Sequence, residues 1–450
     1  MTDTLDLAKH LVELARRAGA EQCDAILVRS EEAEVTVRLG KADRVIDAGS
    51  RGIGLRVING GRTAVCSSSD LSEAALERLA KDTVELALLS ASDEYAGLPD
   101  PATFSRATAD GLALFDEEVE GLTTDTMLEM AGLCEAAGLD FDPRITNSDG
   151  ATVSRRSGEV ALVNSLGFAG HYRTTSVSMM VEVMADDAEG KKRNAYWYDS
   201  QRALHRLMTP EEIGRIAARR AVSQLGARKV STKQVPVVFE PMMAVSLMGM
   251  AAGAANGDAL YKGATFLKDR LGETIGSPLV SIVDDPGQPG RMGSRPFDGE
   301  GVGTRRNVLF EEGVFKAFLF DSYTGRRLGQ PSTGSASRGV GSLPGPGTSN
   351  LTLSPGSLSA EEVVAGVKDG LYVNSLMGQG FNPTTGDYSR GAGGFWIEDG
   401  RLAYPVTEVN ISGRMDAMLA GVDAVGDDLT WFGSVAAPTV RIGSMMVSGT

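Results

Sequence analysis

Histidine, cysteine and acidic side chains are what a protein uses to hold a catalytic metal ion, and this chain is poor in the first two. The complete set of these two residue types is His10, His171, His205, Cys23, Cys66 and Cys134. A catalytic zinc ion takes about three protein ligands and keeps one position open for water. No two of the histidines have the short spacing that places both imidazoles on one helix face. We therefore expect no catalytic metal site in this chain, and the cysteines are predicted to be reduced thiols, most of them buried.

Carboxylates in the second half of the chain could build a different kind of metal site. The candidates are Asp284, Asp285, Asp298, Glu300, Glu311 and Glu312. Oxygen ligands suit magnesium or calcium rather than zinc, but no EF-hand or similarly spaced loop is present. We interpret these acids as turn residues and as ion-pair partners of Arg295, Arg305 and Arg306. A hydrolase with a metal bound to Asp284, Asp285 and Asp298 is the alternative.

Other catalytic and binding motifs are missing from the sequence. No GxSxG elbow occurs, and the nearest local pattern, Gly334 to Ser337, lacks a strand-turn-helix context. No GxxxxGK[ST] phosphate loop occurs, and no GxGxxG leads from a strand into a helix. The sequence therefore supports neither a serine hydrolase nor a nucleotide-binding protein.

One polar cluster in a glycine-rich stretch is a candidate for contacting a substrate or a partner chain. Its members are Gln379, Asp387, Tyr388, Ser389 and Arg390. Glycines allow another backbone to approach closely, and the Arg390 guanidinium offers a fork for a carboxylate, such as a peptide terminus or an acid on a partner. The alternative is that Asp387 and Arg390 pair with each other across a turn.

Hydrophobic periodicity predicts the elements that position these residues. Apolar residues from Leu5 to Ala15 recur at helical spacing, and Gly19 is the expected end of that helix. Residues 24–67 predict an antiparallel meander of short strands, with Asn59-Gly60 as a hairpin turn. Further helices are predicted over 72–89 and 125–137, and after Thr209, which has the pattern of a capping box; strands are predicted over 144–164 and 172–184.

These elements predict an α+β fold in two parts. Residues 1–226 form an N-terminal domain of helices with an antiparallel sheet, residues 227–234 form a polar linker, and residues 235–450 form a β-rich domain. Two hairpins are expected in the second domain, from Val308 and from Phe395. Residues 332–350, rich in Gly, Ser and Pro, are either a plain surface loop or a loop that borders a substrate or an interface.

Composition excludes several classes of protein. The 450 residues are 42% hydrophobic, and 44 basic against 59 acidic residues give a net charge of −15. That charge repels a phosphate backbone and argues against direct nucleic-acid binding. The longest uncharged apolar stretch, residues 241–255, is too short for a membrane span, and the N-terminus carries acids before any apolar run, unlike a secretory signal. With few and scattered cysteines, the expected location is the cytoplasm.

Several segments in order resemble the PmbA/TldE family, the non-identical partners of TldD-type metallopeptidases. The segments are ITNSDGATVS from Ile145, LVNSLGFAGHYRTTSVS from Leu162, YKGATFLKDRLG from Tyr261, PFDGEGVGTRRNVLFEEG from Pro296 and residues 376–413. In TldD-type peptidases a helix of the C-terminal domain carries an HExxxH zinc motif, whereas the comparable region here reads SLMGMAAGAANGDALYKG from Ser246. Those peptidases also use a cysteine near the C-terminus, and the last cysteine here is Cys134.

The resemblance implies a cytoplasmic heteromer in which a TldD-type metallopeptidase subunit carries zinc and this chain helps to enclose the site. Its implied substrates are unfolded or short peptides, so the chain belongs to proteolysis or peptide processing without a catalytic site of its own. The alternative is a peptide-binding or regulatory protein on a peptidase-like scaffold, which would be a homodimer in isolation. The family's older description as a modulator of DNA gyrase belongs with this second interpretation.

Overall fold

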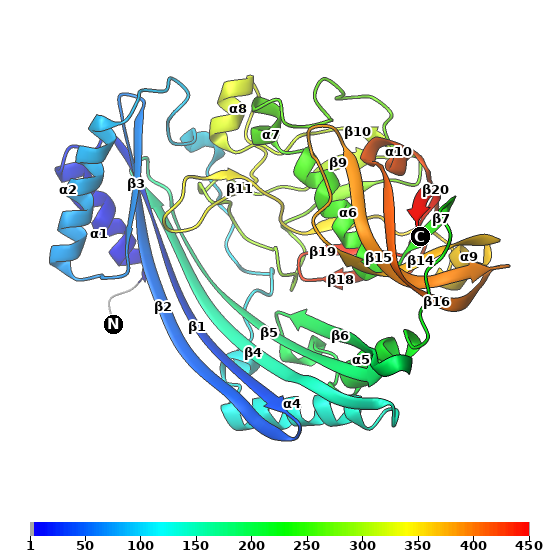
Figure 1. Cartoon of the computed structure of the whole chain (residues 1–450). Coiled ribbons are helices and arrows are strands. Elements are labelled where there is room, and N and C mark those ends of the chain that lie inside the picture. The colour runs from blue at the N-terminus through cyan, green and yellow to red at the C-terminus, as the bar shows by residue number, and fades with distance from the viewer. Residues whose placement is uncertain (1–3, 450) are drawn as a thin grey trace.

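A long, curved antiparallel sheet dominates the first half of the chain (Figure 1). The structure is a computed structural model that describes residues 4–449. The sheet has the strand order β3-β2-β1-β4-β5-β6, and every neighbouring pair is antiparallel. Its strands are β1 (Gln22–Arg38), β2 (Lys41–Asn59), β3 (Arg62–Ser68), β4 (Ile145–Asn164), β5 (Ala169–Asp186) and β6 (Lys192–Gln201).

Helices cover one face of this sheet at its two ends. They are α1 (Thr4–Arg17), α2 (Glu73–Leu89), α3 (Glu117–Glu120), α4 (Thr124–Leu139) and α5 (Pro210–Ser223), with single 3₁₀ turns at Pro101–Thr103, Ala188–Gly190 and Leu204–Arg206. Successive side chains of a strand point to opposite faces, so the buried odd-numbered residues of β1 share one face. Ala25 and Leu27 pack in the cluster with α1 and α2, whereas Val35 and Val37 pack in the cluster with α4 and α5. Ile26 points the other way and packs with Phe297 of the second half.

The second half is built from two six-stranded sheets around one large core. One sheet has the order β16-β15-β14-β7-β20-β17, the other has the order β10-β9-β8-β13-β19-β18, and β11 pairs with β12 separately. The strands are β7 (Lys233–Phe239), β8 (Ile282–Asp284), β9 (Asn307–Glu311), β10 (Val314–Phe315), β11 (Ala336–Ser337), β12 (Gly345–Pro346), β13 (Leu351–Leu353), β14 (Asp369–Met377), β15 (Asp387–Glu398), β16 (Arg401–Arg414), β17 (Val422–Val425), β18 (Thr430–Phe432), β19 (Val435–Ala437) and β20 (Val440–Ser448).

Helices of the second half are α6 (Pro241–Ala254), α7 (Gly257–Tyr261), α8 (Ser322–Leu328), α9 (Ala360–Ala365) and α10 (Met415–Ala420). Helix α6 contacts β7 and β14 of one sheet and β13, β18 and β19 of the other, so it is the central element of this half. In Figure 1 it is drawn in the middle of the second half, with β11 on one side and β15 on the other in this view. The α+β fold class predicted from the sequence is confirmed, with an antiparallel N-terminal sheet and a β-rich second half.

Several local predictions agree with the structure. Thr209 accepts a hydrogen bond from the backbone N–H of Glu212, whose side chain accepts one from the backbone N–H of Thr209, so the capping box is present. Gly60 and Gly61, both with positive φ, make the two-residue turn between β2 and β3. The hairpins predicted from Val308 and Phe395 are β9–β10 and β15–β16. Strand β7 begins at Lys233, so the last two residues of the predicted linker belong to a strand.

The antiparallel meander predicted across residues 24–67 is present as β1, β2 and β3, but its first two strands are not short. The runs AILVRS and EVTVR belong to the single strand β1, and RVIDAG and GLRVIN belong to the single strand β2. Strand β1 pairs along nearly all of its length with β2 on one side and β4 on the other. Because backbone hydrogen bonds on both edges carry the strand through its polar middle, the local break in hydrophobic alternation does not end it.

In the part of the chain that the structure describes, no helix combines the length and the apolar character needed to cross a lipid bilayer.

Candidate functional site

The exposed stripe of α6 is the first part of the candidate site. Gly249 and Met250 lie three and four residues after Ser246, and Gly253 lies four and three residues after these two, which places all four on one face of the helix. All four lie outside the buried core, and an added Cβ at Gly249 or Gly253 would meet no atom within 4 Å. Most of the rest of α6, including Leu247 and the neighbouring Met248, is buried in the core between the two sheets. The stripe therefore presents a shallow and largely apolar surface.

A zinc ion does not fit this stripe. Imidazole, thiolate and carboxylate groups are the usual zinc ligands, and the stripe offers a hydroxyl, a thioether and two glycines. Across residues 4–449, no three His, Cys, Asp or Glu side chains come together in a way that could hold a metal ion. His10 and His171 instead pair with Glu73 at 2.8 Å and Glu159 at 2.7 Å.

Cys23 and Cys134 supply no reactive nucleophile to this site. Burial is the main cause that raises the pKa of Cys23 to about 12, and it does the same for Cys134. Both thiols therefore stay protonated near neutral pH, and they lie in the two helix-sheet clusters of the first half, away from α6.

Arg390 lies next to the α6 stripe. Its Nη1 is 3.4 Å from the Ser246 Oγ, which itself donates a hydrogen bond to the Met243 carbonyl at 2.7 Å. The Nε of Arg390 is buried and has no hydrogen-bond partner among the described residues. A half-buried guanidinium with unused N–H donors can bind a carboxylate more strongly than a guanidinium that is already paired with an acid.

Strand β15 divides the other predicted site residues between two faces. Asp387 and Ser389 are exposed, whereas Tyr388 is 1% exposed and points, like Arg390, to the opposite face. Burial raises the pKa of Tyr388 to about 12, against the opposing effect of the Arg390 charge. Ser389 accepts a hydrogen bond from Asn410 at 2.8 Å.

Asp387 and Gln379 both lie at the protein surface. Asp387 accepts a hydrogen bond from Thr385 at 2.6 Å, and within residues 4–449 no ion pair joins it to Arg390. Gln379 is exposed just after β14, on the segment whose Gly380 carbonyl accepts the backbone N–H of Ser389. The five residues are thus close in the chain and do not share one surface, so any role in binding substrate or partner stays a proposal for each of them separately.

At the start of α6, an ion pair connects the helix to the first half. Glu240 is the residue that precedes α6. Its carboxylate accepts hydrogen bonds from both Nη groups of Arg220 on α5, at 2.7 and 2.9 Å. Arg220 also donates to the carbonyl of Asn374 at 2.8 Å. Burial raises the pKa of Glu240, although Arg220 opposes that change. This forked pair fixes the end of α6 relative to α5, and so fixes the direction in which the exposed stripe faces.

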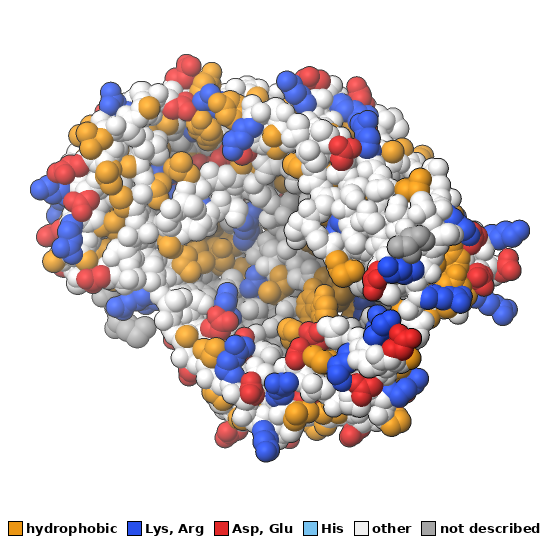
Figure 2. Space-filling view, viewed as in Figure 1, with side chains coloured by type: hydrophobic (Ala, Val, Ile, Leu, Met, Phe, Trp, Pro, Cys, Tyr) orange, Lys and Arg blue, Asp and Glu red, His pale blue; other side chains and the backbone are white. Residues whose placement is uncertain are grey.

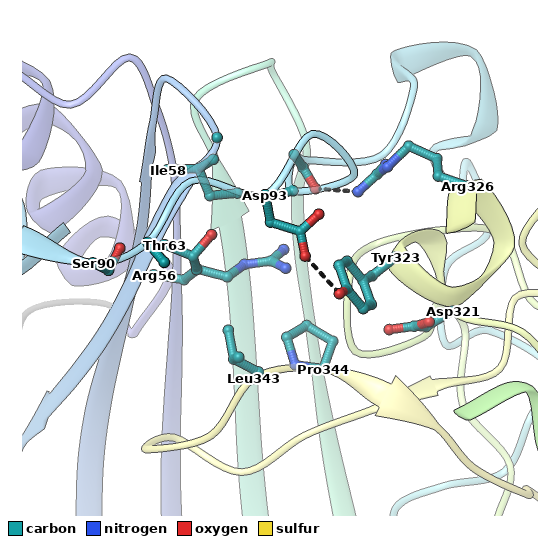
Figure 3. Close-up of a pocket in the computed structure, with 14 residues that line it drawn as sticks. Arg56, Ile58, Thr63, Ser90, Asp93, Asp321, Tyr323, Arg326, Leu343 and Pro344 are labelled. Atoms are coloured by element: carbon teal, nitrogen blue, oxygen red, sulfur yellow. Dashed lines mark hydrogen bonds between the residues drawn. The ribbon is translucent and has the colours of Figure 1, made fainter. Parts of the chain in front are cut away.

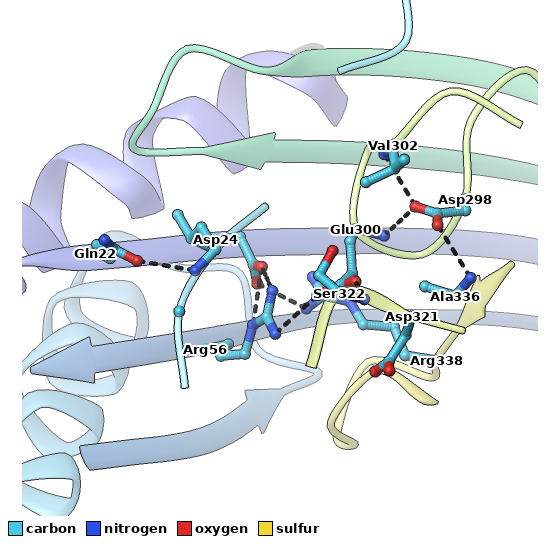
Figure 4. A network of polar contacts seen from close by, with 12 residues as sticks. Gln22, Asp24, Arg56, Asp298, Glu300, Val302, Asp321, Ser322, Ala336 and Arg338 are labelled. Atoms are coloured by element: carbon cyan, nitrogen blue, oxygen red, sulfur yellow. Dashed lines mark hydrogen bonds and ion pairs between the residues drawn. The ribbon is translucent and has the colours of Figure 1, made fainter. Parts of the chain in front are cut away.

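A second, fully buried ionic network joins the two halves near the other end of the N-terminal sheet (Figure 4). Arg56 on β2 donates from Nε to Asp24 on β1 at 3.0 Å, and its Nη1 lies 3.4 Å from Glu300 of the second half. Arg338 donates from Nη1 to the other oxygen of Asp24 at 2.7 Å. Asp24, Arg56 and Glu300 are each at most 5% exposed. Burial opposes the charged form of Asp24, but the charges of Arg338 and Arg56 hold its pKa below the ordinary value.

Asp298 and Glu300 hold the surrounding loops in place. The Asp298 carboxylate accepts the backbone N–H groups of Glu300, Val302 and Ala336 at 2.9 to 3.0 Å, and Glu300 accepts that of Ser322 at 2.8 Å. Burial, together with the charge of Glu300, raises the pKa of Asp298 to about 7.

Among the described residues, no ion pair joins the acids of the second half to Arg295, Arg305 or Arg306, contrary to the prediction. Glu300 pairs across the domain boundary with Arg56, and Glu311 pairs with Lys316. Sequence reasoning missed the network because its members come from five separate segments.

The loop over residues 332–350 belongs to this network. Arg338 is 2% exposed, and an added Cβ on Gly54 of β2 would lie 1.7 Å from the Val340 carbonyl. The loop is therefore packed directly on the N-terminal sheet, although its composition is typical of a mobile surface loop. Gly54 is the sequence signal that could have indicated a close approach, because a glycine inside a strand often marks one.

A cavity of about 260 Å³ lies beside the network (Figure 3). Arg56, the loop after α2, α8 and the tip of the 332–350 loop line it. Its polar groups are engaged with one another: Tyr323 donates to Asp93 at 2.7 Å, and Arg326 donates to the carbonyls of Tyr95, Gly97 and Leu98. Viewed as a surface, the molecule is hollowed between the N-terminal sheet and the second half, with hydrophobic side chains inside the hollow (Figure 2).

Sequence models of three domains match almost the whole chain. The PmbA/TldA metallopeptidase domain 1 matches residues 23–87, the central domain matches residues 117–225, and the C-terminal domain matches residues 232–449. The metalloprotease PmbA of Escherichia coli O157:H7 is 34% identical over 92% of this chain and 89% of its own length. A metalloprotease TldD homolog of Haemophilus influenzae is 24% identical, over 86% of this chain and 82% of its own length.

Two solved structures share the fold over almost the full length. A protein of Bacteroides thetaiotaomicron described as a modulator of DNA gyrase superimposes with a TM-score of 0.93 at 27% identity, covering 100% of both chains. TldE from Thermococcus kodakarensis superimposes with a TM-score of 0.89 at 22% identity, covering 98% of this chain and 100% of its own.

Proposed function

Since this chain belongs to the PmbA/TldD metallopeptidase family, we propose that it is the non-catalytic subunit of a heteromeric zinc peptidase. In this proposal a TldD-type subunit holds the zinc ion, and the assembled pair degrades or processes unfolded or short peptides. The chain acts in the cytoplasm, where its three free cysteines stay reduced. Residues 1–226 and 235–450 are its two domains, joined by residues 227–234.

The donor set on α6 is the observation that carries this proposal. A family of metallopeptidases needs a ligand-bearing element, and the exposed stripe of the central helix here offers Ser246, Gly249, Met250 and Gly253. None of these groups is a good zinc ligand. This supports the assignment of the metal to another subunit, with the stripe of this chain as a wall beside the peptide.

The role of this chain is then to bind and orient peptide. Arg390 lies beside the stripe with a buried Nε that has no partner among the described residues, so it can bind a carboxylate of the peptide or of the partner. The apolar surface of the stripe can contact side chains of an unfolded peptide, and hydrophobic side chains also gather in the hollow between the halves (Figure 2).

The test is to produce this chain together with the HExxxH-bearing relative encoded by the same genome. The two chains are purified separately and as a mixture, and zinc per chain, complex mass and cleavage of an unstructured peptide are measured for each. We expect zinc to follow the relative, a complex of defined mass, and cleavage that needs both chains. Stoichiometric zinc and cleavage in this chain alone would overturn the proposal, as would full activity of the relative without it.

A further inference from the structure

Among the described residues, no strand lies beside the outer edge of one half of β2. Strand β2 pairs with β1 along its whole length, but β3 pairs with it only from Ile53 onward. Within the described chain, no strand pairs with the outer edge of residues 41–52, which runs along the margin of the molecule in Figure 1. At about 3.4 Å per residue, this edge offers close to 40 Å of unpaired backbone N–H and C=O groups.

Both faces of the same segment are also exposed to solvent. Every residue from Lys41 to Arg51 is exposed, although all of them belong to a regular strand. Val45 is 53% exposed and Ile46 is 39% exposed, and consecutive residues point to opposite faces. Natural edge strands are usually short, covered or bent away from further pairing. An edge this long, with an apolar side chain open on each face, is typical of a surface that another chain covers.

The charges along this edge argue against a second copy of the same chain. A two-fold axis between identical antiparallel strands places one residue opposite itself, so each register has one central residue. Registers centred on Arg44 or Asp47 place identical charges face to face, and the register centred on Val45 places Asp43 opposite Asp47. Like charges directly opposite each other destabilise a strand pair.

Two further symmetric registers are centred on Ile46 and on Ala48. The register centred on Ile46 places Lys41 opposite Arg51, so it also ends in a like-charge pair. The register centred on Ala48 avoids like charges but offers no opposite-charge pair, and it places Val45 opposite Arg51. Each symmetric register that pairs nine or more residues of this edge thus either contains a like-charge pair or lacks an opposite-charge pair. The register centred on Gly49 places Asp47 opposite Arg51 but pairs only residues 46–52, whereas a strand of different sequence can complement the whole edge.

We propose that the outer edge of β2, over residues 41–52, pairs with a strand of the non-identical TldD-type subunit. That strand carries basic groups opposite Asp43 and Asp47 and an acidic group opposite Arg44. Backbone hydrogen bonds supply the binding, and the charge pattern selects the partner over a second copy of this chain. This inference rests on the proposed heteromer and names one of its interfaces.

The experiment compares two double variants with the same change in net charge. Asp43→Lys with Asp47→Lys reverses the acids of the edge, and both side chains are exposed with no ion pair among the described residues. Glu77→Lys with Asp82→Lys makes the same change on the exposed side of α2. We expect the edge variant to bind the zinc-bearing relative at least tenfold more weakly at low salt, and the α2 variant to bind within about twofold of the unchanged chain.

Hydrogen exchange supplies a readout specific to strand pairing. In the complex, the outward-facing backbone amides, which belong to alternate residues of 41–52, are expected to exchange at least tenfold more slowly than in the free chain. Unchanged exchange there, or equal affinities of the two variants, would overturn the inference and leave β2 as a charged protective edge. A homodimer of this chain that the edge variant abolishes would overturn the choice of partner. If no heteromer forms at all, it is the proposed function that fails.

Discussion

Arg338 and Asp24 form an ion pair in which both side chains are 2% exposed, with Nη1 of one 2.7 Å from Oδ1 of the other. They belong to different halves of the molecule, since Asp24 lies on the first strand of the N-terminal sheet and Arg338 on the loop over residues 332–350. Arg56 shares the same carboxylate. Asp24 therefore faces two buried cations, of which Arg56 also has Glu300 as a partner, and the Arg338 ion pair attaches the loop to the sheet.

Replacing Asp24 by Asn should lower the free energy of unfolding by about 3–5 kcal/mol, because it removes the acid that pairs with buried Arg338 and leaves Arg56 with Glu300 alone. Urea unfolding followed by circular dichroism measures this change. The control is Glu32→Gln, which removes the acid of the exposed pair with Arg156 and should cost less than about 1 kcal/mol. Equal losses in the two variants would show that the buried network does not hold the halves together.

Gly54→Ala should displace the 332–350 loop, because the new methyl group would lie 1.7 Å from the Val340 carbonyl. We expect a loss of about 1–3 kcal/mol in stability and faster proteolysis within the loop. Gly49→Ala in the same strand is the matched control, since its methyl group would meet nothing within 4 Å. A loop that stays equally resistant to protease in both variants would contradict the packing described here.

Stability should fall as pH rises from about 4 to about 6, in part through Asp284. Burial raises the pKa of Asp284 to about 6, so in this window the folded chain binds more protons than the unfolded chain. By linkage the unfolding free energy then decreases with rising pH, by up to about 3 kcal/mol for this one group. Asp284→Asn keeps an acceptor for Ser349 and removes the titration, so its stability curve should be flatter across this window.

Arg390→Ala should weaken peptide binding by the assembled heteromer without unfolding this chain. We expect the KM for a peptide with a free C-terminus to rise about tenfold while kcat changes little, and Arg390→Lys should restore little because the forked geometry is lost. Arg401→Ala, at an exposed position of β16, is the control. If Arg390→Ala instead prevents assembly, the carboxylate that it binds belongs to the partner.

Local chemistry made much of the fold predictable. The capping box at Thr209 and the Gly60-Gly61 turn depend on residues within a few positions of one another, and both occur as expected. The polar cluster over residues 379–390 was less accessible to such reasoning, because its division between two faces depends on the exact start of β15 at Asp387.

The ionic network was outside the reach of sequence reasoning for a different reason. Nothing local distinguishes Asp24 or Glu300 from the rest of the 59 acidic residues, and Arg56 and Glu300 are 244 positions apart. Their pairing follows from the way the two halves pack. The curvature of the N-terminal sheet sets that packing, and it depends on contacts along whole strands.

The separation between Asp24 and Arg338 also sets an order of events during synthesis. The two residues are 314 positions apart, which a ribosome covers in about 15–60 s at typical rates of translation. For that interval the nascent N-terminal sheet holds Asp24 and Arg56 without Glu300 or Arg338. The surface around Asp24 is thus exposed to water and to chaperones while the second half is being synthesised. It is buried only when the 332–350 loop packs against the sheet.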